Sequence, residues 1–307
     1  MEFIRGIHNL RPKHHGSVAT IGNFDGVHLG HQHVLSHFAV KAKEFGCPST
    51  VITFEPQPLE YFAPDSAPAR LMRLRDKVRA LQCYEVDRVL CLRFNKALAS
   101  MPYQEFIDRV LVKGLGVRYL VVGDDFRFGK NREGTFQHLV EAGRQDHFDV
   151  VNMHTLAIDG ERVSSTRIRT ELEAGNFKEA EELLGQPYKM SGRVAHGEKL
   201  GRELGFPTAN IHIHRKVTPL HGIYVVKVSG LKEQAVEGVA SIGTRPAVNG
   251  KKVILEVFLF DFDESIYGQY IEVSFLKKLR DEENFDSLDD LKQQIAIDVK
   301  QAKAFFA

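Results

Sequence analysis

The stretch from Ile21 to His31, IGNFDGVHLGH, contains residue types that can handle phosphates. It follows an apolar, β-branched run at Ser17–Ile21 and precedes apolar residues at helical spacing that end at Gly46. A tight loop between a strand and a helix points backbone N–H groups and the positive end of the helix dipole at a bound anion. Because His28 and His31 are three residues apart, both imidazoles can stand on one helix face and stabilise charge on a nucleotide's phosphates.

The glycines of this loop, Gly22, Gly26 and Gly30, allow the backbone to bend and to approach a ligand closely. The alternative is that the two histidines form an ordinary surface pair and that the Asp25 side chain only hydrogen-bonds to the backbone of its own turn. The pattern Gly-x-x-Asp-Gly-x-His-x-Gly-His between a strand and a helix favours a phosphate site. It resembles the nucleotidyltransferase signature, whose members transfer a nucleoside monophosphate and release pyrophosphate.

The composition bounds the class of protein. A chain of 307 residues fits two domains, and contents of 43% hydrophobic and 26% charged residues are typical of a soluble globular protein. Lys+Arg 41 against Asp+Glu 40 gives a net charge of +1, which does not favour a nucleic-acid partner. The sequence has no apolar run of about 20 residues and no signal peptide at Met1–Arg5, so no membrane is expected. Cys47, Cys83 and Cys91 lack Cys-x-x-Cys spacing and indicate reduced, buried, cytoplasmic thiols.

Strand and helix patterns alternate through the first half. The predicted strands are Ser17–Ile21, Ser49–Phe54, Val89–Leu92, Tyr119–Val122 and Phe148–Met153. This alternation predicts a parallel, Rossmann-like sheet covered by helices, with ligands at the carboxyl ends of the strands. That edge would bring His28, Glu55 and Asp125 together.

The segment Val163–Arg169, VSSTRIR, allows two interpretations. Its serines can form an ordinary helix N-cap. Alternatively, the hydroxyls and free N–H groups bind phosphate oxygens while Arg169 neutralises a pyrophosphate leaving group.

The pattern changes after a helix predicted at 177–184, and we place the domain boundary at Gln186/Pro187. Alternating strand patterns then follow without an intervening helix, at Val194, Ile223–Val228, Ala235–Ile242, Val253–Phe260 and Tyr270–Phe275. They predict a small antiparallel β-barrel. A final helix capped by Ser287 is expected to close it, turning Leu288, Leu291, Ile295, Val299 and Ala302 inward.

In this half the stretch from Gly201 to Asn210 is glycine-rich and can be a simple hairpin. However, Thr208 and Asn210 are two residues apart on a strand, so their oxygens lie on one side, where they suit Mg²⁺ bound to phosphates. Glu256 lies between apolar neighbours and, without a motif, would be expected to point to solvent from an edge strand.

Four motifs of the first half, GNFDGVHLGH, TFEP, GDDFRFG and SSTxxR, occur in the order found in the FMN adenylyltransferase domain of bacterial FAD synthetases, which this half resembles. We expect residues 1–186 to form this domain. Gln57 replaces the His of the family loop and is assigned no role. The resemblance implies ATP contacts by Gly22, Asn23, Phe24, Asp25, His28, His31, Ser164, Ser165, Thr166 and Arg169, with Phe54, Pro56, Pro58, Asp125 and Phe128 near the flavin.

Residues 187–307 resemble riboflavin kinase through the motif PTAN at 207–210 and the later runs GVASIGTRP, LEV, YG and LR. In that family the Glu of the LEV strand is the base that acts on the terminal ribityl hydroxyl of riboflavin, which assigns Glu256. Ala247 and Phe258 replace the expected Thr and His, so the edge of the flavin pocket departs from the family. The implied contacts are Gly201, Thr208 and Asn210 for ATP, Thr208 and Asn210 for Mg²⁺, and Gly205, Phe206, Pro207, Glu256 and Arg280 for the flavin.

The resemblance implies a bifunctional enzyme that phosphorylates riboflavin to FMN with Mg-ATP and adenylylates FMN to FAD. The partners would be riboflavin, FMN, FAD and ATP, and the oligomeric state stays open. One rival is a class I aminoacyl-tRNA synthetase, suggested by HxGH and by Lys189-Met190-Ser191, although the near-zero charge disfavours it. The other is a flavin or nucleotide sensor, which would have no use for the His pair and Glu256.

Overall fold

The structure, a computed structural model, describes residues 1–307 except 124, 154–155, 198–200, 202–203, 216 and 248–249, and only the backbone of 245–247 and 250–252. The described residues form two compact units. The first comprises Met1–Pro68 and Met72–Ser164, and the second comprises Ala69–Leu71 and Ser165–Ala307. The chain therefore leaves the first unit at Pro68, returns to it at Met72, and leaves it again at Ser164.

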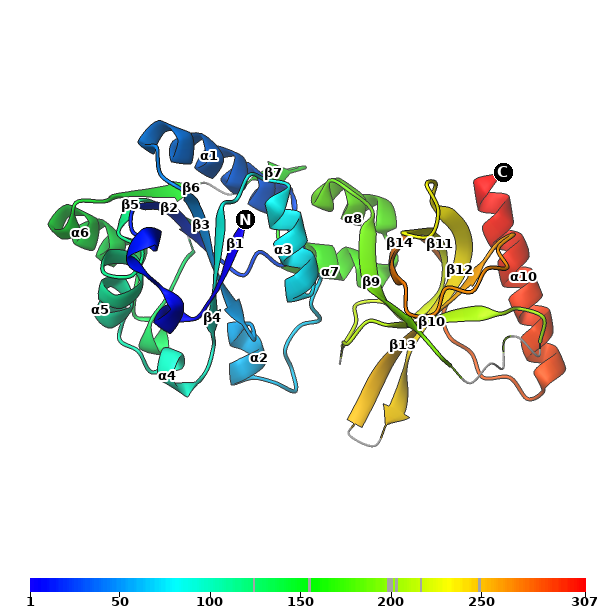
Figure 1. Ribbon diagram of the computed structural model, residues 1–307. Helices are drawn as coiled ribbons and strands as arrows, with labels where there is room; N and C mark the ends of the chain where they lie inside the picture. Colours follow the sequence, from blue (N-terminus) through cyan, green and yellow to red (C-terminus); the bar gives the residue numbers. More distant parts are fainter. Residues whose placement is uncertain (124, 154–155, 198–200, 202–203, 216, 248–249) are drawn as a thin grey trace. The chain divides into compact units, whose positions relative to one another are not determined.

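The first unit is built on a six-stranded parallel sheet with the order β1-β4-β3-β2-β5-β6 (Figure 1). Its strands are β1 (Glu2–Arg5), β2 (Ser17–Ile21), β3 (Ser49–Glu55), β4 (Arg88–Arg93), β5 (Val117–Gly123) and β6 (Asp149–Met153). Its helices are α1 (Leu29–Phe45), α2 (Pro58–Phe62), α3 (Leu74–Gln82), α4 (Lys96–Ala99), α5 (Tyr103–Phe106), which continues as a π-helix (Ile107–Val112), and α6 (Phe136–Asp146). Short 3-10 turns (Ile7–Asn9, Pro12–His14, Lys130–Arg132) and a hairpin of β7 (Ala157–Ile158) and β8 (Glu161–Arg162) complete the unit.

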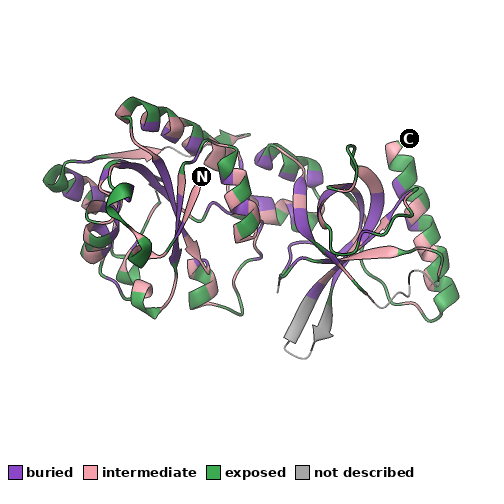
Figure 2. Ribbon diagram, viewed as in Figure 1, coloured by how far each residue is buried: buried purple, intermediate pink, exposed green. Residues whose placement is uncertain are grey.

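Consecutive residues of the central strands pack on opposite faces of this sheet. Val51 of β3 belongs to a buried cluster with Leu35 of α1 and Leu81 of α3. Its neighbour Ile52 belongs to the other cluster, with Phe106 of α5. Since both faces are covered, the central strands are buried (Figure 2) and form continuous apolar runs in the sequence.

The second unit begins with α7 (Ser165–Ala174) and α8 (Phe177–Leu184). A closed antiparallel barrel follows, with the strand order β10-β13-β12-β11-β14-β9. The predicted α/β unit and antiparallel barrel are both confirmed. The barrel strands and the closing helix are β9 (Tyr188–Ala195), β10 (Thr208–His212), β11 (Gly222–Ser229), β12 (Val236–Ala247), β13 (Gly250–Leu259), β14 (Tyr270–Arg280) and α10 (Leu288–Phe306).

Helix α10 starts as predicted, because Ser287 Oγ accepts a hydrogen bond from the backbone N–H of Asp290 at 3.1 Å. Ala302 is fully buried against the barrel. Leu288 faces the barrel cavity that it lines, but it is 58% exposed and does not join the core. The buried position that the sequence did not predict is Asp298, which is 3% exposed.

Several elements of the first unit were not predicted, among them β1, α2, α4 and α6, and β1 extends the sheet at one edge. The prediction that all three cysteines are buried is wrong, because Cys83 is exposed and Cys47 is half-buried. The predicted domain boundary at Gln186/Pro187 does not coincide with the boundary of the compact units at Ser164/Ser165. Helices α7 and α8 belong to the second unit. The assignment of separate activities to residues 1–186 and 187–307 stays a prediction.

Candidate functional site

The loop between β2 and α1 is tightly wound. The φ angles of Phe24, Gly26 and Val27 are 48°, 87° and 41°. A positive φ at a β-branched residue such as Val27 costs on the order of 1–3 kcal/mol. Val27 is 1% exposed, so its packing offsets part of this cost. A side chain at Gly30 would lie only 3.2 Å from the His28 ring, so glycine permits this close approach.

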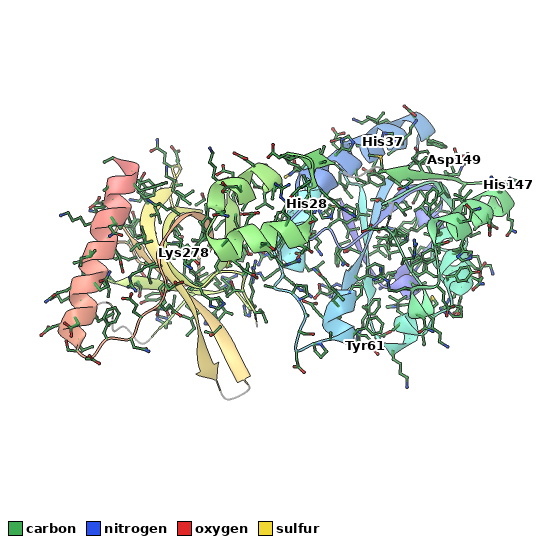
Figure 3. The ribbon with its side chains drawn as sticks, turned by 180° about the vertical axis from the view of Figure 1, so that it is seen from behind. His28, His37, Tyr61, His147, Asp149 and Lys278 are labelled. Carbon is green, nitrogen blue, oxygen red and sulfur yellow. The ribbon has the colours of Figure 1, made fainter. Side chains whose placement is uncertain are left out.

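The two histidines of this loop form one structural pair. His28 is the N-cap of α1, at the position labelled in Figure 3, and its Nδ1 accepts from the backbone N–H of His31 at 3.4 Å. Because Nδ1 accepts, this hydrogen bond assigns the ring proton of His28 to Nε2. The two rings stack with centroids 3.7 Å apart, and the Phe24 ring lies 5.0 Å from that of His31. The prediction that both imidazoles share one face is confirmed.

His31 is held in its neutral form. Burial, followed by the electrostatic effects of His28, Lys77 and Arg162, lowers the pKa of His31 well below its usual value of 6.5. The residue as a whole is half-buried, but its Nδ1 is buried without a hydrogen-bond partner among the described residues. A neutral imidazole with nearby cations suits a ligand that brings its own negative charge.

Lys77 and Arg162 are charges near this pair that the sequence analysis missed. Lys77 lies on α3 and is 0% exposed. It falls between Leu74 and Leu81 on the apolar face of the helix, and a lysine at such a position was a usable signal. Arg162 lies on β8 and directly precedes the hydroxyl-rich segment, which was a second signal.

Three of the predicted ATP-binding residues hold the loop to its surroundings. The Gly22 N–H donates to the carbonyl of Ile52 at 3.0 Å. Asp25 is 2% exposed, and its Oδ1 accepts from the Met72 N–H at 3.0 Å. The carbonyl of Asn23 accepts from a threonine hydroxyl of β3 at 3.5 Å. These contacts fix the β2–α1 loop against β3 and against the segment before α3, while Phe24 lies beside the His31 ring.

The predicted flavin residues at the end of β3 and just after it lie at the same end of the sheet as the β2–α1 loop, because β3 and β2 are parallel neighbours. Phe54 is half-buried and meets the Phe94 ring edge-on, with centroids 5.9 Å apart. Pro56 and Pro58 are half-buried and flank Gln57. Gln57 is 7% exposed, and its Nε2 has no hydrogen-bond partner in the described part of the chain.

The two predicted flavin residues after β5 differ in exposure. Asp125 is exposed, and its Oδ2 accepts from Arg162 Nη1 at 3.0 Å. Phe128 is 6% exposed and stacks on Phe126 with centroids 5.4 Å apart. Phe128 therefore packs in the core of the first unit, whereas Asp125 is accessible at its surface.

In the second unit, α7 begins at Ser165, as the hydroxyl-rich segment predicted. Ser164 is the last residue of the first unit, while Ser165, Thr166 and Arg169 belong to the second. Thr166 is exposed, and the other two side chains are half-buried. Arg169 Nε donates to the carbonyl of Ala69 at 2.5 Å.

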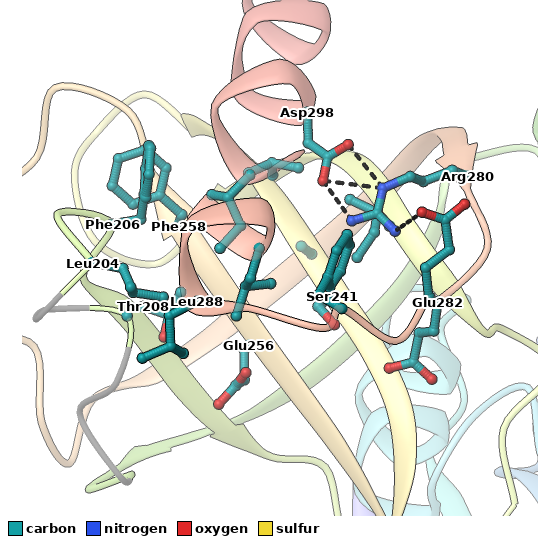
Figure 4. Close-up of a pocket in the computed structure, with 18 of the residues that line it drawn as sticks. Leu204, Phe206, Thr208, Ser241, Glu256, Phe258, Arg280, Glu282, Leu288 and Asp298 are labelled. Atoms are coloured by element: carbon teal, nitrogen blue, oxygen red, sulfur yellow. Dashed lines mark hydrogen bonds and ion pairs between the residues drawn. The ribbon is translucent and has the colours of Figure 1, made fainter. Parts of the chain in front are cut away.

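The barrel holds a cavity of about 530 Å³ (Figure 4). Its walls come from β10, β12, β13, the end of β14 and α10. Predicted kinase residues that line it are Gly201, Phe206, Thr208, Asn210, Glu256 and Arg280. Gly205 and Pro207 are exposed and adjoin this wall in sequence.

Strand register places the polar residues of the cavity side by side. Glu256 of β13 lies directly opposite Asn210 of β10 and directly opposite Ser241 of β12. Directly opposed residues have Cβ atoms about 4.5–5.5 Å apart on the same face. Thr208 shares that face with Asn210 because side chains alternate along a strand. Since β13 has partners on both sides in a closed barrel, Glu256 is not on an edge strand.

One side of the cavity is aromatic. The Phe206 and Phe258 rings meet edge-on with centroids 5.5 Å apart, and Thr208 is paired with Phe258 across β10 and β13. The carbonyl of Gly201 accepts from the Phe206 N–H at 2.7 Å, which holds these two cavity residues together. Phe258, the departure noted in the sequence, therefore lines the cavity. The side chain of Ala247, the other departure, lies outside the described residues.

Arg280 lines the cavity with its guanidinium bound to α10. Arg280 Nε and Nη2 donate to Asp298 Oδ1 and Oδ2 at 2.9 and 2.8 Å (Figure 4). Arg280 Nη1 donates to the carbonyl of Asp281, and Gln294 Nε2 donates to Asp298 Oδ1. Arg280 is thus held as a strut between β14 and α10, which the flavin prediction did not anticipate.

Two kinds of feature are absent from the described residues. No three His, Cys, Asp or Glu side chains there come together as a metal-binding group. Within the same residues, no helix is long and apolar enough to cross a membrane.

These units define an enzyme class that uses nucleotides in two ways. A parallel sheet with a histidine pair at its first helix N-terminus is the architecture of a nucleotidyltransferase. A barrel cavity lined by Thr208, Asn210 and Glu256 is suited to phosphoryl transfer to a hydroxyl.

A family model described as FAD synthetase matches residues 10–167, and one described as riboflavin kinase matches residues 184–306. The chain belongs to the family of bifunctional riboflavin kinase/FMN adenylyltransferases. Relatives of that name from Haemophilus influenzae and Escherichia coli K12 are each 50% identical, covering 100% of this chain and 99% and 98% of their own. A Pseudomonas fluorescens relative of the same name is 51% identical, covering 100% of this chain and 98% of its own. A solved Streptococcus pneumoniae structure, named a macrolide-efflux protein, is 31% identical with a TM-score of 0.80, covering 97% of each chain.

Proposed function

We propose that this protein phosphorylates riboflavin to FMN with ATP and then adenylylates FMN to FAD, releasing pyrophosphate. The observation that carries the proposal is the position of Glu256, in register with Asn210 and lining the barrel cavity. Residues 1–186 would serve the adenylyl transfer, and residues 187–307 the kinase. A cytoplasmic location follows as part of the proposal, since both reactions draw on ATP.

In the kinase reaction, Glu256 accepts the proton of the terminal ribityl hydroxyl. The hydroxyl oxygen bonds to the γ-phosphorus of ATP while the bond to the bridging oxygen breaks, giving FMN and ADP. The hard oxygens of Thr208 and Asn210 suit Mg²⁺, which would neutralise charge on the phosphates. Gly201 would lie near ATP, while Gly205, Phe206 and Pro207 would contact the flavin. Arg280 would act there mainly by holding α10, given its bonds to Asp298.

In the adenylyl transfer, a phosphate oxygen of FMN bonds to the α-phosphorus of ATP, and the bond to pyrophosphate breaks. His28 donates from Nε2, and the neutral His31 can also donate, so both stabilise the charge that develops on the phosphates. Ser164, Ser165 and Thr166 would bind phosphate oxygens, and Arg169 would neutralise the leaving pyrophosphate. Gly22, Asn23, Phe24 and Asp25 would shape the ATP pocket, and the flavin would lie near Phe54, Pro56, Pro58, Asp125 and the segment of Phe128.

The test incubates the purified chain with riboflavin, ATP and Mg²⁺ and separates the flavins by chromatography. We expect FMN first and FAD later, with both products lost when EDTA removes the metal. Supplying FMN in place of riboflavin should yield FAD directly. A chain that binds flavin but makes neither product would instead be a sensor.

A further inference from the structure

Three residues that interrupt the first unit in sequence, Ala69–Leu71, are packed into the second unit. The segment before them is largely exposed, including Pro68. Ala69 is 6% exposed and Leu71 is 0% exposed. Because these three residues become buried directly after an exposed loop, we expect side chains of the second unit to bind their backbone.

Arg215, in the segment that follows β10, binds this backbone. It is 9% exposed. Arg215 Nη1 donates to the carbonyl of Arg70 at 2.6 Å, and Nη2 donates to the carbonyl of Leu71 at 2.9 Å. Nη1 also donates to the hydroxyl of Tyr188 at 2.8 Å. A buried guanidinium with three such donor contacts fixes the path of the backbone it binds.

The same segment binds a second arginine through its third carbonyl. The carbonyl of Ala69 accepts from Nε of Arg169, on α7. Three consecutive carbonyls, those of Ala69, Arg70 and Leu71, are thus shared between the two arginines. Because a hydrogen bond to Nε fixes the plane of a guanidinium, the position of Ala69 determines how Arg169 presents its charge.

We propose that Arg215 is a positioning residue for the adenylyl transfer, acting on Arg169 through the backbone of Ala69–Leu71. This rests on the proposed role of Arg169 toward pyrophosphate. Arg215 lies in the sequence region of the kinase, yet it does not line the barrel cavity. Its loss would therefore impair adenylyl transfer and spare riboflavin phosphorylation.

The test measures the reverse reaction, in which FAD and pyrophosphate give FMN and ATP, together with riboflavin phosphorylation by the same full-length preparation. Arg215→Met removes the donors and keeps the apolar stem. Arg215→Lys keeps a donor, and Tyr188→Phe is the matched control because it removes one contact of Arg215 and leaves both carbonyl contacts. The double variant Arg169→Ala with Arg215→Met tests whether Arg215 acts through Arg169.

For Arg215→Met we expect the KM for pyrophosphate to rise roughly tenfold or more, with the KM for FAD and the kinase rate unchanged. Arg215→Lys should retain part of the effect of arginine, and Tyr188→Phe should behave as the parent. The double variant should be no worse than Arg169→Ala alone. A parent-like KM for pyrophosphate in Arg215→Met, or equal loss of both activities in both Arg215 variants, would overturn the role of Arg215. A parent chain that makes no FAD at all would overturn the proposed function instead.

Discussion

The two phosphate-handling regions of this protein are built in different ways. In the first unit, the two proposed phosphate donors are close in sequence, because His28 and His31 stand three residues apart at the start of one helix. In the barrel, the chemistry is long-range, because Glu256 meets Asn210 only through the pairing of β13 with β10. The first region offers neutral donors, and the second offers a carboxylate.

The difference follows from the two reactions. A phosphate oxygen of FMN is already an anion at neutral pH, so the adenylyl transfer needs donors and positive charge more than a base. A ribityl hydroxyl is a poor nucleophile until its proton is accepted, so the kinase needs a base. Variants that change only one of the two regions should therefore impair only one of the two reactions.

The largest effect is expected for Glu256→Gln, which keeps the shape of the side chain and removes the base. FMN formation should fall by roughly 10² to 10⁴. FAD formation from supplied FMN should stay near the parent rate. Glu272→Gln is the matched control, since Glu272 is a strand glutamate outside the cavity that pairs with Lys189. If the Glu256 variant phosphorylates riboflavin at the parent rate, Glu256 is not the base.

The next largest effect is expected for His31→Ala, which removes a preorganised donor. The rate of FAD formation from FMN should fall by about 10² to 10³. Riboflavin consumption should continue, so FMN should accumulate on the chromatogram. His33→Ala, at an exposed position of the same helix, should have no effect. If riboflavin consumption falls equally, the two sites are not separate.

A smaller effect is expected for Asp298→Asn, which weakens the strut between β14 and α10. Losing a hydrogen bond to a charged group costs roughly 1.5–3 kcal/mol of unfolding free energy. Since α10 forms a cavity wall, the KM for riboflavin should rise more than kcat falls, and FAD formation from FMN should be unchanged. Asp261→Asn is the control, because Asp261 also pairs with α10, through Lys303, but its side chain is 89% exposed. An unchanged KM would mean that the strut does not shape the cavity.

The smallest expected effect is the pH dependence from His31. The lowered pKa keeps the folded-state imidazole neutral, whereas the unfolded chain takes up a proton below about pH 6.5. Stability should therefore fall as the pH drops below that value, because the unfolded state then binds more protons. Thermal unfolding of the parent and of His31→Gln from pH 7 to pH 5 checks this. The parent should lose more stability than the variant over that range, and parallel curves would contradict it.

The sequence predicted the histidine pair of the first unit better than the cavity residues of the barrel. The spacing of His28 and His31 on a helix was enough to place both rings on one face. The position of Glu256 could be predicted only from the family motif. Its partners Asn210 and Ser241 are 46 and 15 positions away in sequence, and local residue spacing does not reveal strand register. Arg280 was assigned to the flavin from the family resemblance, and nothing in the local sequence indicated that its partner is Asp298 on α10.

Two further charged residues owe their importance to burial. Lys77 and Arg215 are charged, and a charge is normally expected at the surface. Only the packed structure shows that each is enclosed. The boundary between units could not be read from the sequence for a similar reason, since Ala69–Leu71 is too short to show a pattern of its own.

The most direct test of two separate sites on one chain is a mixing experiment. The His31→Ala and Glu256→Gln variants are assayed singly and together with riboflavin, ATP and Mg²⁺, and a chain carrying both substitutions is the control. We predict that each single variant makes little FAD, that the mixture makes FAD because FMN from the first variant is used by the second, and that the double variant makes none. A mixture that makes no more FAD than either variant alone, although His31→Ala releases FMN, would contradict the central claim.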